Sequence, residues 1–179
     1  MKQLIISLCC FFTAIYVQAS AVRTINIPGM NTYRLAVLNS PDGEQTLAGT
    51  TYNWEVYHAD LKGNLLWKAK TGGFCFDMAA KDIDGDGKDD LILGCGDDSV
   101  YCYSHDGEKL WSKGLRNGPV YSVATISHEN KTYILAGTVL NTLFVMDTQG
   151  EVISQKKLGG AIRELVISDF DGDGKEDTQ

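Results

Sequence analysis

Short stretches in which apolar and polar residues alternate recur along the chain. Residues 56–60, 100–104 and 143–147 show this pattern. Successive side chains of a strand point to opposite faces, so alternation is expected of a strand with one face against a core. No stretch of the repeated sequence shows the 3.6-residue period of an amphipathic helix. The pattern therefore predicts an all-β protein.

These strands belong to a repeat of about 44 residues. Segments 63–67, 107–111 and 150–154 each open with a glycine and begin 44 and then 43 residues apart. Further apolar stretches keep the same step, at 47–49, 93–94 and 135–137, and at the opening of each unit, at 33–38, 77–80, 121–126 and 163–168. Each unit therefore holds four short strands, and four strands at this period are the signature of a β-propeller blade.

The repeat predicts blades at about 33–76, 77–120 and 121–162, and the start of a fourth at 163–179. Trp67 and Trp111 recur on the last strand of their units and are expected to fill the contact between neighbouring blades, whereas Ser154 weakens that contact in the third unit. Closed propellers have about four to eight blades. We therefore expect an incomplete propeller, the N-terminal fragment of a longer protein.

Residues 1–19 have the layout of a secretory signal peptide. An apolar run at 4–17 is followed by small residues near a cleavage point after Ala19. The run is shorter than the roughly 20 apolar residues of a membrane-spanning helix. A retained anchor and a lipid anchor at Cys9 or Cys10 are the alternatives. The sequence thus predicts a protein exported to the periplasm, the cell surface or the medium.

The remaining residues, 20–179, suffice for one domain with its own core. The formal net charge is −7, and the lysines and arginines are scattered rather than clustered. Binding to nucleic-acid phosphates needs clustered basic residues, so nucleic acid is excluded as a partner. No later segment approaches the length and apolarity of a membrane span, so none is expected after cleavage of the signal peptide.

Three cysteines, Cys75, Cys95 and Cys102, follow the signal peptide. The interpretation we favour is that all three are small core side chains. The alternative is a disulfide between Cys95 and Cys102, which flank the turn at 96–99 and can face each other across a hairpin.

Two loops share the pattern D-x-D-G-D-G-x-x-D, at 82–90 and 169–177, 87 residues or two repeat units apart. Calcium takes six to eight oxygen ligands, and alternate carboxylates on a tightly turning backbone supply them. Glycine at the sixth position permits the sharp bend. The loops therefore predict bound Ca²⁺ with a structural role.

The predicted ligands are the side chains at positions one, three, five and nine and the carbonyl at position seven. They are Asp82, Asp84, Asp86, Lys88 and Asp90 in the first loop, and Asp169, Asp171, Asp173, Lys175 and Asp177 in the second. An EF-hand needs a Glu at position twelve, where this chain has Leu93. The alternative is an ordinary Asp-Gly turn that binds no ion. The first and third units lack the ligand set, so calcium is expected in alternate blades only.

The loops, followed by the apolar residues 91–94, resemble FG-GAP or VCBS-type repeats, the integrin-α-like propellers. Residues 100–111 are similar to the blade motif of quinoprotein-like (PQQ-like) propellers. Together the resemblances cover residues 33–177. They imply a rigid, calcium-stiffened propeller used for adhesion, ligand binding or as a scaffold. They do not imply bound pyrroloquinoline quinone.

The sequence favours a non-catalytic module that binds an extracellular ligand, either carbohydrate or protein. His58, His105 and His128 are scattered along the sequence and form no catalytic motif. The alternative is the N-terminal part of a propeller enzyme, lyase-like, that acts on polysaccharide. In that alternative Tyr52, Trp54, Tyr101 and Tyr121 are available to stack on sugar rings, although aromatic residues at repeat-matched positions more often belong to the blade core. Arg116 and Arg163 are the candidate arginines near the axis.

Overall fold

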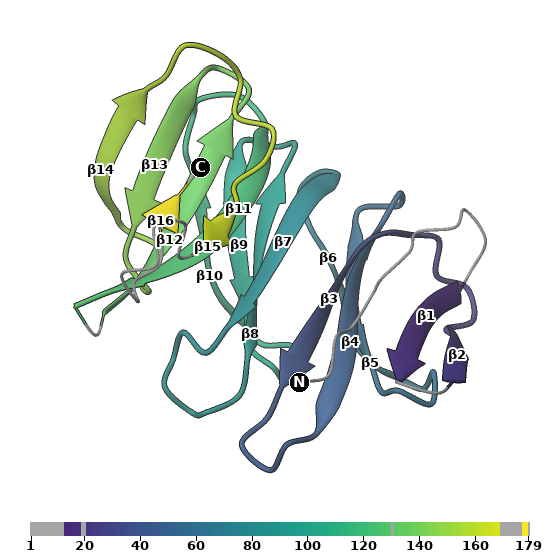
Figure 1. Ribbon diagram of the computed structural model, residues 1–179. Coiled ribbons are helices and arrows are strands. Elements are labelled where there is room, and N and C mark those ends of the chain that lie inside the picture. The colour runs from purple at the N-terminus through teal and green to yellow at the C-terminus, as the bar shows by residue number, and fades with distance from the viewer. Residues whose placement is uncertain (1–12, 19–20, 130, 169–176, 179) are drawn as a thin grey trace.

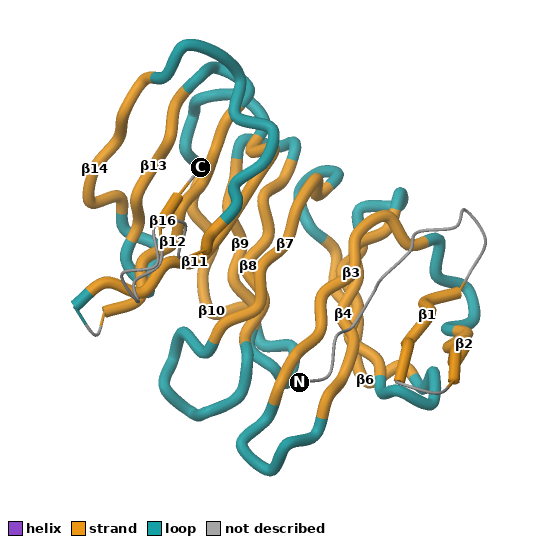
Figure 2. Tube along the Cα trace, in the orientation of Figure 1, coloured by secondary structure: helices purple, strands orange, loops and turns teal. Residues whose placement is uncertain are grey.

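The computed structural model describes residues 13–18, 21–129, 131–168 and 177–178. In this part of the chain there is no helix, and so none that could cross a membrane. Most of the strands form three four-stranded antiparallel sheets that stand side by side as blades (Figures 1 and 2). The predicted all-β fold of four-stranded propeller blades is confirmed.

The strands follow each other in chain order within each sheet. The first sheet holds β3 (Thr32–Asn39), β4 (Gln45–Thr51), β5 (Glu55–Ala59) and β6 (Leu65–Lys70). The second holds β7 (Cys75–Lys81), β8 (Asp90–Cys95), β9 (Ser99–Tyr103) and β10 (Lys109–Gly114). The third holds β11 (Val120–His128), β12 (Lys131–Thr138), β13 (Thr142–Met146) and β14 (Val152–Lys157). Two short pairs flank the blades, β1 (Thr13–Gln18) with β2 (Ala21–Asn26), and β15 (Ile167–Ser168) with β16 (Asp177–Thr178).

The first strand of each sheet is the inner one, so β3, β7 and β11 lie next to one another and run in the same direction (Figure 1). Their starts therefore share one end of the molecule, and their ends share the other. The turns between strands also lie at one or the other of these two ends. The turn after β4 lies with the start of β3, because Thr51 pairs with Thr32.

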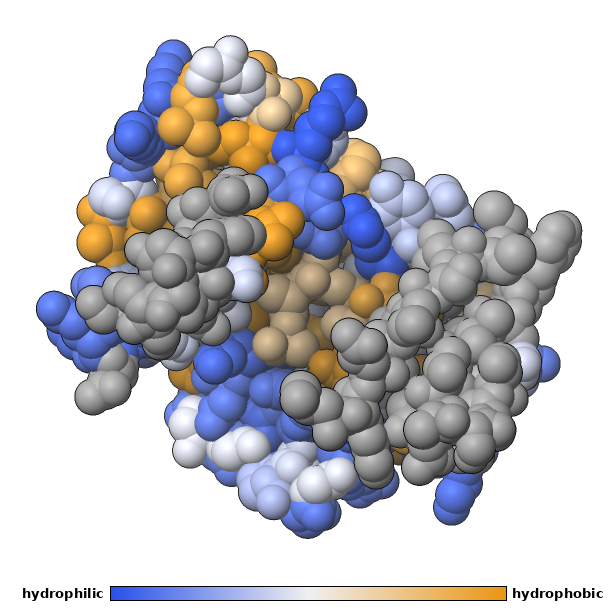
Figure 3. Space-filling view, viewed as in Figure 1, coloured by the Kyte–Doolittle hydropathy of each residue, from blue (hydrophilic) through white to orange (hydrophobic). Residues whose placement is uncertain are grey.

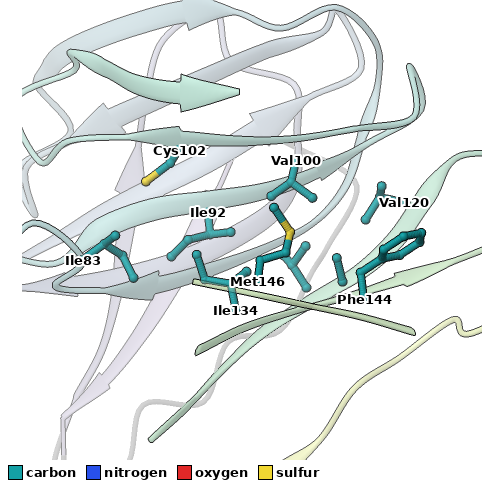
Figure 4. Packing of buried hydrophobic residues seen from close by; sticks show 10 residues of the cluster. Ile83, Ile92, Val100, Cys102, Val120, Ile134, Phe144 and Met146 are labelled. Atoms are coloured by element: carbon teal, nitrogen blue, oxygen red, sulfur yellow. The ribbon is translucent and has the colours of Figure 1, made fainter. Parts of the chain in front are cut away.

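The hydrophobic core lies between the blades. Residues of the second and third sheets interdigitate in one cluster, which includes Ile92, Val100, Ile134, Phe144 and Met146 (Figure 4). Neighbouring residues of β8 serve opposite faces, since Leu91 and Leu93 pack against the first sheet and Ile92 against the third. Strand β8 is consequently buried on both faces, and its residues 91–95 read as a continuous apolar run.

The two repeated tryptophans join neighbouring blades, as the sequence predicts. Trp67 of β6 donates from Nε1 to the carbonyl of His105, 2.7 Å away in the turn after β9. Trp111 of β10 donates in the same way to the carbonyl of Thr148, 3.0 Å away in the turn after β13. Each indole lies against a glycine, Gly107 or Gly150, where a side chain would collide with the ring.

Strand β2 is an element that the hydrophobic pattern did not predict. Ile25, Ile27 and Met30 are buried against the first sheet. Gly63 has the place in the first sheet that Gly107 has in the second, and Ile25 and Asn26 lie against it. The region of β2 thus covers the first sheet where the outer strand of a preceding blade would lie. Its partner β1 falls within the predicted signal peptide, of which residues 1–12 and 19 lie outside the described residues.

The favoured interpretation of the cysteines was wrong for two of them. Cys75 and Cys95, paired across β7 and β8, form a disulfide. Cys102 is free and buried in the core, and burial raises the pKa of its thiol. The alternative pairing of Cys95 with Cys102 was also wrong. The sequence places Cys75 and Cys95 in strands joined by the long Asp-rich loop, so their proximity depends on the strand register.

Candidate functional site

The first Asp-rich loop joins β7 to β8 and gathers three carboxylates. Asp82, Asp84 and Asp86 each offer an oxygen, and these oxygens lie within 4.8 Å of one another. Gly85 and Gly87 have φ values of +87° and +88°. Such values are readily adopted by glycine alone, which lets the backbone turn tightly enough for alternate side chains to converge.

Backbone amides hold these carboxylates in place. Asp82 accepts from the amides of Gly85 and Gly87, at 2.7 and 3.0 Å. Asp84 accepts from Asp86 N at 3.0 Å, and Asp86 from Lys88 N at 2.8 Å. A carboxylate has about four lone-pair sites, so these bonds leave oxygens able to bind a cation. The three residues therefore fit part of a calcium shell of six to eight oxygens.

The remaining predicted ligands of this loop have other partners. Asp90 is fully buried at the start of β8, and its carboxylate accepts from the amides of Ile83, Asp84 and His105. Burial, aided by the charge of Asp84, raises the pKa of Asp90. The ammonium group of Lys88 pairs with Asp106 at 3.1 Å. Asp90 thus anchors the loop to the blade, apart from the converging group.

The second loop lies between strands in the same register as the first. Ser168 pairs with Asp177 as Lys81 pairs with Asp90. Its predicted ligands Asp169, Asp171, Asp173 and Lys175 lie outside the described residues. The binding of calcium by this loop stays a prediction.

A pocket of about 220 Å³ lies at the opposite end of the inner strands from the first loop. Its walls are three aromatic rings and two guanidinium groups, contributed by Tyr33, Arg34, Phe76, Tyr121 and Arg163. The sequence singled out Tyr121 and Arg163 among its candidates. It missed Tyr33, Arg34 and Phe76, because an aromatic or basic residue at the start of a strand does not show which way it points.

Contacts between the lining residues organise the pocket. Arg34 donates from Nε to the carbonyl of Phe76 at 3.0 Å, and its guanidinium carbon lies 5.7 Å from the centre of the Tyr33 ring. Arg163 lies at the same distance, 5.7 Å, from the ring of Tyr121. Cation–π contacts at this distance hold each guanidinium beside an aromatic face.

One carboxylate lies close to these arginines. Asp77 is 3.9 Å from Nε of Arg34, and it also accepts from the amide of Val123 at 3.0 Å. Burial raises the pKa of Asp77, while the amide bonds and Arg34 act in the opposite direction. Asp77 therefore ties the three inner strands together and offsets part of the charge of Arg34.

Aromatic rings continue from the pocket across the first two blades. Tyr121 meets Phe76 with 4.7 Å between ring centres, and Phe76 meets Phe74 at 5.0 Å. Phe74 in turn meets Tyr33 at 4.7 Å and Tyr52 at 5.6 Å. Figure 3 shows the molecule in the orientation of Figure 1, with apolar surface over β7 between hydrophilic side chains. The row ends at Tyr52, which is 54% exposed.

Two of the histidines meet, although they are far apart in the sequence. The rings of His58 and His105 lie 4.7 Å apart at the contact of the first two blades. His58 is buried, with Nε2 bonded to the hydroxyl of Thr46 at 2.6 Å and Nδ1 to the carbonyl of His105 at 3.1 Å. Burial first, and the charge of His105 second, lower the pKa of His58 to about 4. His58 is thus neutral near pH 7, and its contact with His105 joins the two blades at a site remote from the pocket.

Comparison with known families places this geometry in context. The model of the lambda-carrageenase beta-propeller domain matches residues 46–160. The chain belongs to the lambda-carrageenase β-propeller family. Two relatives, each called lambda-carrageenase, come from Pseudoalteromonas carrageenovora and a Pseudoalteromonas species, and are 32% and 30% identical over 128 residues. That alignment spans 71% of this chain and 14% of either relative.

Solved structures show the same fold at low sequence identity. BBS1N, crystallised in complex with ARL6DN, has a TM-score of 0.72 and 15% identity over 87% of this chain and 49% of its own. Sqt1 of Saccharomyces cerevisiae has a TM-score of 0.73 and 10% identity over 86% of this chain and 47% of its own. These likenesses concern the fold alone. The chain therefore has the architecture of many propellers, while its sequence is similar to those of the lambda-carrageenase propellers.

Proposed function

We propose that this chain is the propeller part of an exported enzyme that acts on a sulfated polysaccharide. The observation that carries the proposal is the match to the lambda-carrageenase propeller family over residues 46–160. The substrate in that family name, λ-carrageenan, is a galactan that bears sulfate esters. Sequence patterns alone favour a non-catalytic module and keep a polysaccharide enzyme as the alternative. The family match supports the alternative.

In this proposal the propeller holds the polysaccharide. Its pocket combines aromatic rings with arginines, and these groups suit sugar rings and their anionic substituents. The chain spans 14% of the length of its two relatives. We therefore assign it a binding role and leave the bond-breaking groups to the whole enzyme.

Calcium in this proposal is a structural ion. The first loop follows the end of β7, whereas Phe76 of the pocket lies at its start, five residues earlier than Lys81. At about 3.3 Å per residue, that separation is about 17 Å. An ion bound by Asp82, Asp84 and Asp86 is thus too far from the pocket to contact the same sugar ring. The supporting observation is the convergence of the three carboxylates.

Export is supported by the disulfide between Cys75 and Cys95, because disulfides persist in oxidising compartments. The signal-peptide pattern of residues 1–19 points to the same destination. We propose that the mature protein acts in the periplasm, at the cell surface or in the medium.

The test is an assay of the full-length protein on λ-carrageenan, with size-exclusion chromatography to follow chain length. We expect shorter chains to accumulate, and no change with heat-inactivated protein. Agarose and polygalacturonate serve as neutral and carboxylated comparison polymers. Binding of λ-carrageenan without any shortening would restore the non-catalytic module. Shortening of polygalacturonate alone would point to a different substrate class.

A further inference from the structure

We propose that the end of the propeller bearing the pocket is a saccharide-binding face that selects anionic sugars, through the rings of Tyr52, Trp54 and Tyr121 and the guanidinium of Arg163. This inference rests on the proposed action on a sulfated polysaccharide, and it assigns the recognition of the substrate to named residues. Three independent features of the structure support it.

The first feature is a β-bulge repeated in every blade. The pairing register shifts at Tyr33 in β3, at Phe76 in β7 and at Tyr121 in β11, and each of these residues is left without a partner in the neighbouring strand. A bulge re-aims the side chain of the extra residue. All three extra residues are aromatic, and all three line the same pocket. The bulges thus turn one ring from each blade toward a shared space.

Arg163 has the corresponding position in the fourth repeat. Gly94 of the second sheet packs against Val120, the residue before Tyr121, and Gly137 of the third sheet packs against Ile162, the residue before Arg163. Where three repeats place a ring, the fourth therefore places a guanidinium. In the part of the chain that the structure describes, Arg163 has no ion pair, and its guanidinium lies beside the ring of Tyr121.

The second feature is the charge of the pocket. The protein as a whole has a net charge of −7, yet among the residues that the structure describes two arginines and no carboxylate line this pocket. Asp77 offsets part of the charge of Arg34, whereas Arg163 has no ion pair among the described residues and is therefore the better placed of the two to attract an anion. A guanidinium presents a planar fork of donors that matches the oxygens of sulfate, phosphate or carboxylate groups. The pocket is thus locally selective for a negatively charged substituent.

The third feature is the backbone conformation of Trp54. Trp54, Asp98 and Asn141 have equivalent places in the turn between the second and third strands of their blades, and all three have positive φ, at 61°, 65° and 67°. Asp and Asn tolerate this left-handed conformation, whereas a bulky side chain there costs roughly 1–2 kcal/mol. Strain of this kind at one repeat and not at the others points to a function.

Trp54 is held in that conformation and presented to solvent. Its carbonyl accepts from the amide and the hydroxyl of Thr71, at 3.0 and 3.1 Å, while its side chain is 53% exposed. Its turn follows β4, at the end of the first sheet where β3 begins. Tyr52 in the same turn contacts Tyr33, with 5.4 Å between the ring centres. Trp54 thus lies exposed in the same turn as Tyr52, at which the aromatic row ends, and its ring is available as a platform for a sugar outside the pocket.

The size of the pocket sets how much of the ligand it holds. At about 220 Å³ it is smaller than the roughly 300–1,000 Å³ of pockets that enclose drug-sized ligands. It therefore suits a single sugar ring with its charged substituent. The neighbouring sugars of the polymer would lie across Tyr52 and Trp54.

Two substitutions in the full-length protein test the inference, with titration calorimetry against λ-carrageenan oligosaccharides. Arg163→Ala removes one charge-assisted contact and should raise Kd about tenfold. Trp54→Asn places in the first blade the residue that the third blade has at Asn141. It should raise Kd about tenfold as well while leaving the melting temperature unchanged or higher, since the strain is relieved. Lys62→Ala, in a turn at the opposite end of the first sheet, is the matched control for loss of a positive charge.

Agarose oligosaccharides, which are neutral, should bind at least tenfold more weakly than λ-carrageenan oligosaccharides. Oligogalacturonate separates two forms of the same selectivity: tight binding shows recognition of any anionic sugar, and weak binding shows preference for sulfate. Wild-type affinity in both Arg163→Ala and Trp54→Asn, or equal affinity for agarose, would overturn the inference. The two proposals can fail separately. If the wild-type protein shortens no polymer but both variants bind λ-carrageenan oligosaccharides more weakly, the proposed enzyme activity is contradicted and the binding face is supported.

Discussion

The carboxylate of Asp89 in the second blade accepts two hydrogen bonds from Asn39 in the first blade. Its Oδ2 accepts from both the backbone amide and the side-chain amide of Asn39, each at 2.8 Å. The amide of Asp89 donates in return to the carbonyl of Asn39 at 3.0 Å. Asn39 ends β3 of the first blade, and Asp89 belongs to the Asp-rich loop of the second. The loop is therefore fastened to its neighbour as well as folded on itself.

We predict that Asp89→Ala lowers the free energy of unfolding by about 1–2 kcal/mol, because two hydrogen bonds to a charged but exposed acceptor are lost. Urea denaturation of the full-length protein measures the change. Asp42→Ala, which affects a local turn of the first blade, should have a smaller effect. An Asp89→Ala variant as stable as the wild type would show that the hydrogen bonds between Asn39 and Asp89 contribute nothing to stability.

Calcium removal should lower the melting temperature. Without the cation, the oxygens of Asp82, Asp84 and Asp86 face one another across less than 4.8 Å. Differential scanning calorimetry with and without a chelator measures the effect. Asp86→Ala, and Asp173→Ala in the second loop, should reduce the response to the chelator. If calorimetric titration of the calcium-free protein with Ca²⁺ gives no heat of binding, the metal assignment fails.

Gly107→Ala should destabilise the contact between the first two blades. Gly107 has a φ of +92°, and a Cβ there would lie 2.7 Å from Cγ of Trp67. Gly43 has a similar φ of +81° with no atom within 4 Å, so Gly43→Ala isolates the backbone strain. We expect about 1–2 kcal/mol of lost stability for Gly43→Ala and about 1–3 kcal/mol more for Gly107→Ala. Equal losses would mean that the indole moves aside at no cost.

Stability should fall on acidification because of His58. Its folded-state pKa of about 4 lies below its ordinary value of 6.5, so the folded state binds protons less readily than the unfolded state. The contribution of His58 is present above pH 6.5 and is lost progressively as the pH falls toward 4, by up to about 3 kcal/mol. The free energy of unfolding, measured by urea denaturation at several pH values in this range, should therefore depend less on pH in His58→Gln than in the wild type. His128→Gln, at a histidine with an exposed side chain, is the control substitution.

The disulfide between Cys75 and Cys95 should contribute about 3 kcal/mol, since it closes a segment of 20 residues. A double Cys75→Ser, Cys95→Ser variant should therefore unfold at a lower denaturant concentration. Peptide mapping of the non-reduced protein should recover a fragment that links Cys75 to Cys95. A map that instead links Cys102 to either of them would contradict the pairing.

The repeat in the sequence was sufficient to predict the blades. Four strands per unit follow from the alternation of apolar and polar residues and from the 44- and 43-residue steps. Both can be seen in the sequence without knowledge of tertiary contacts. The same holds for the contact between Trp67 and the next blade, because a ring that recurs once per repeat must meet the same neighbour each time. The carboxylates of the first loop converge for a local reason too, since Gly85 and Gly87 turn the backbone between them.

Only the tertiary structure decided where the pocket lies. Tyr33, Phe76 and Tyr121 come together because each occupies a bulge, and a bulge depends on the register between two strands rather than on either strand alone. The pairing of Cys75 with Cys95 depends on register in the same way. The burial of Asp90, its bond to the amide of His105 and the meeting of His58 with His105 likewise require contacts between segments distant in the chain. Sequence thus determined the repeating unit and the local loop, while packing between strands and blades decided which side chains meet.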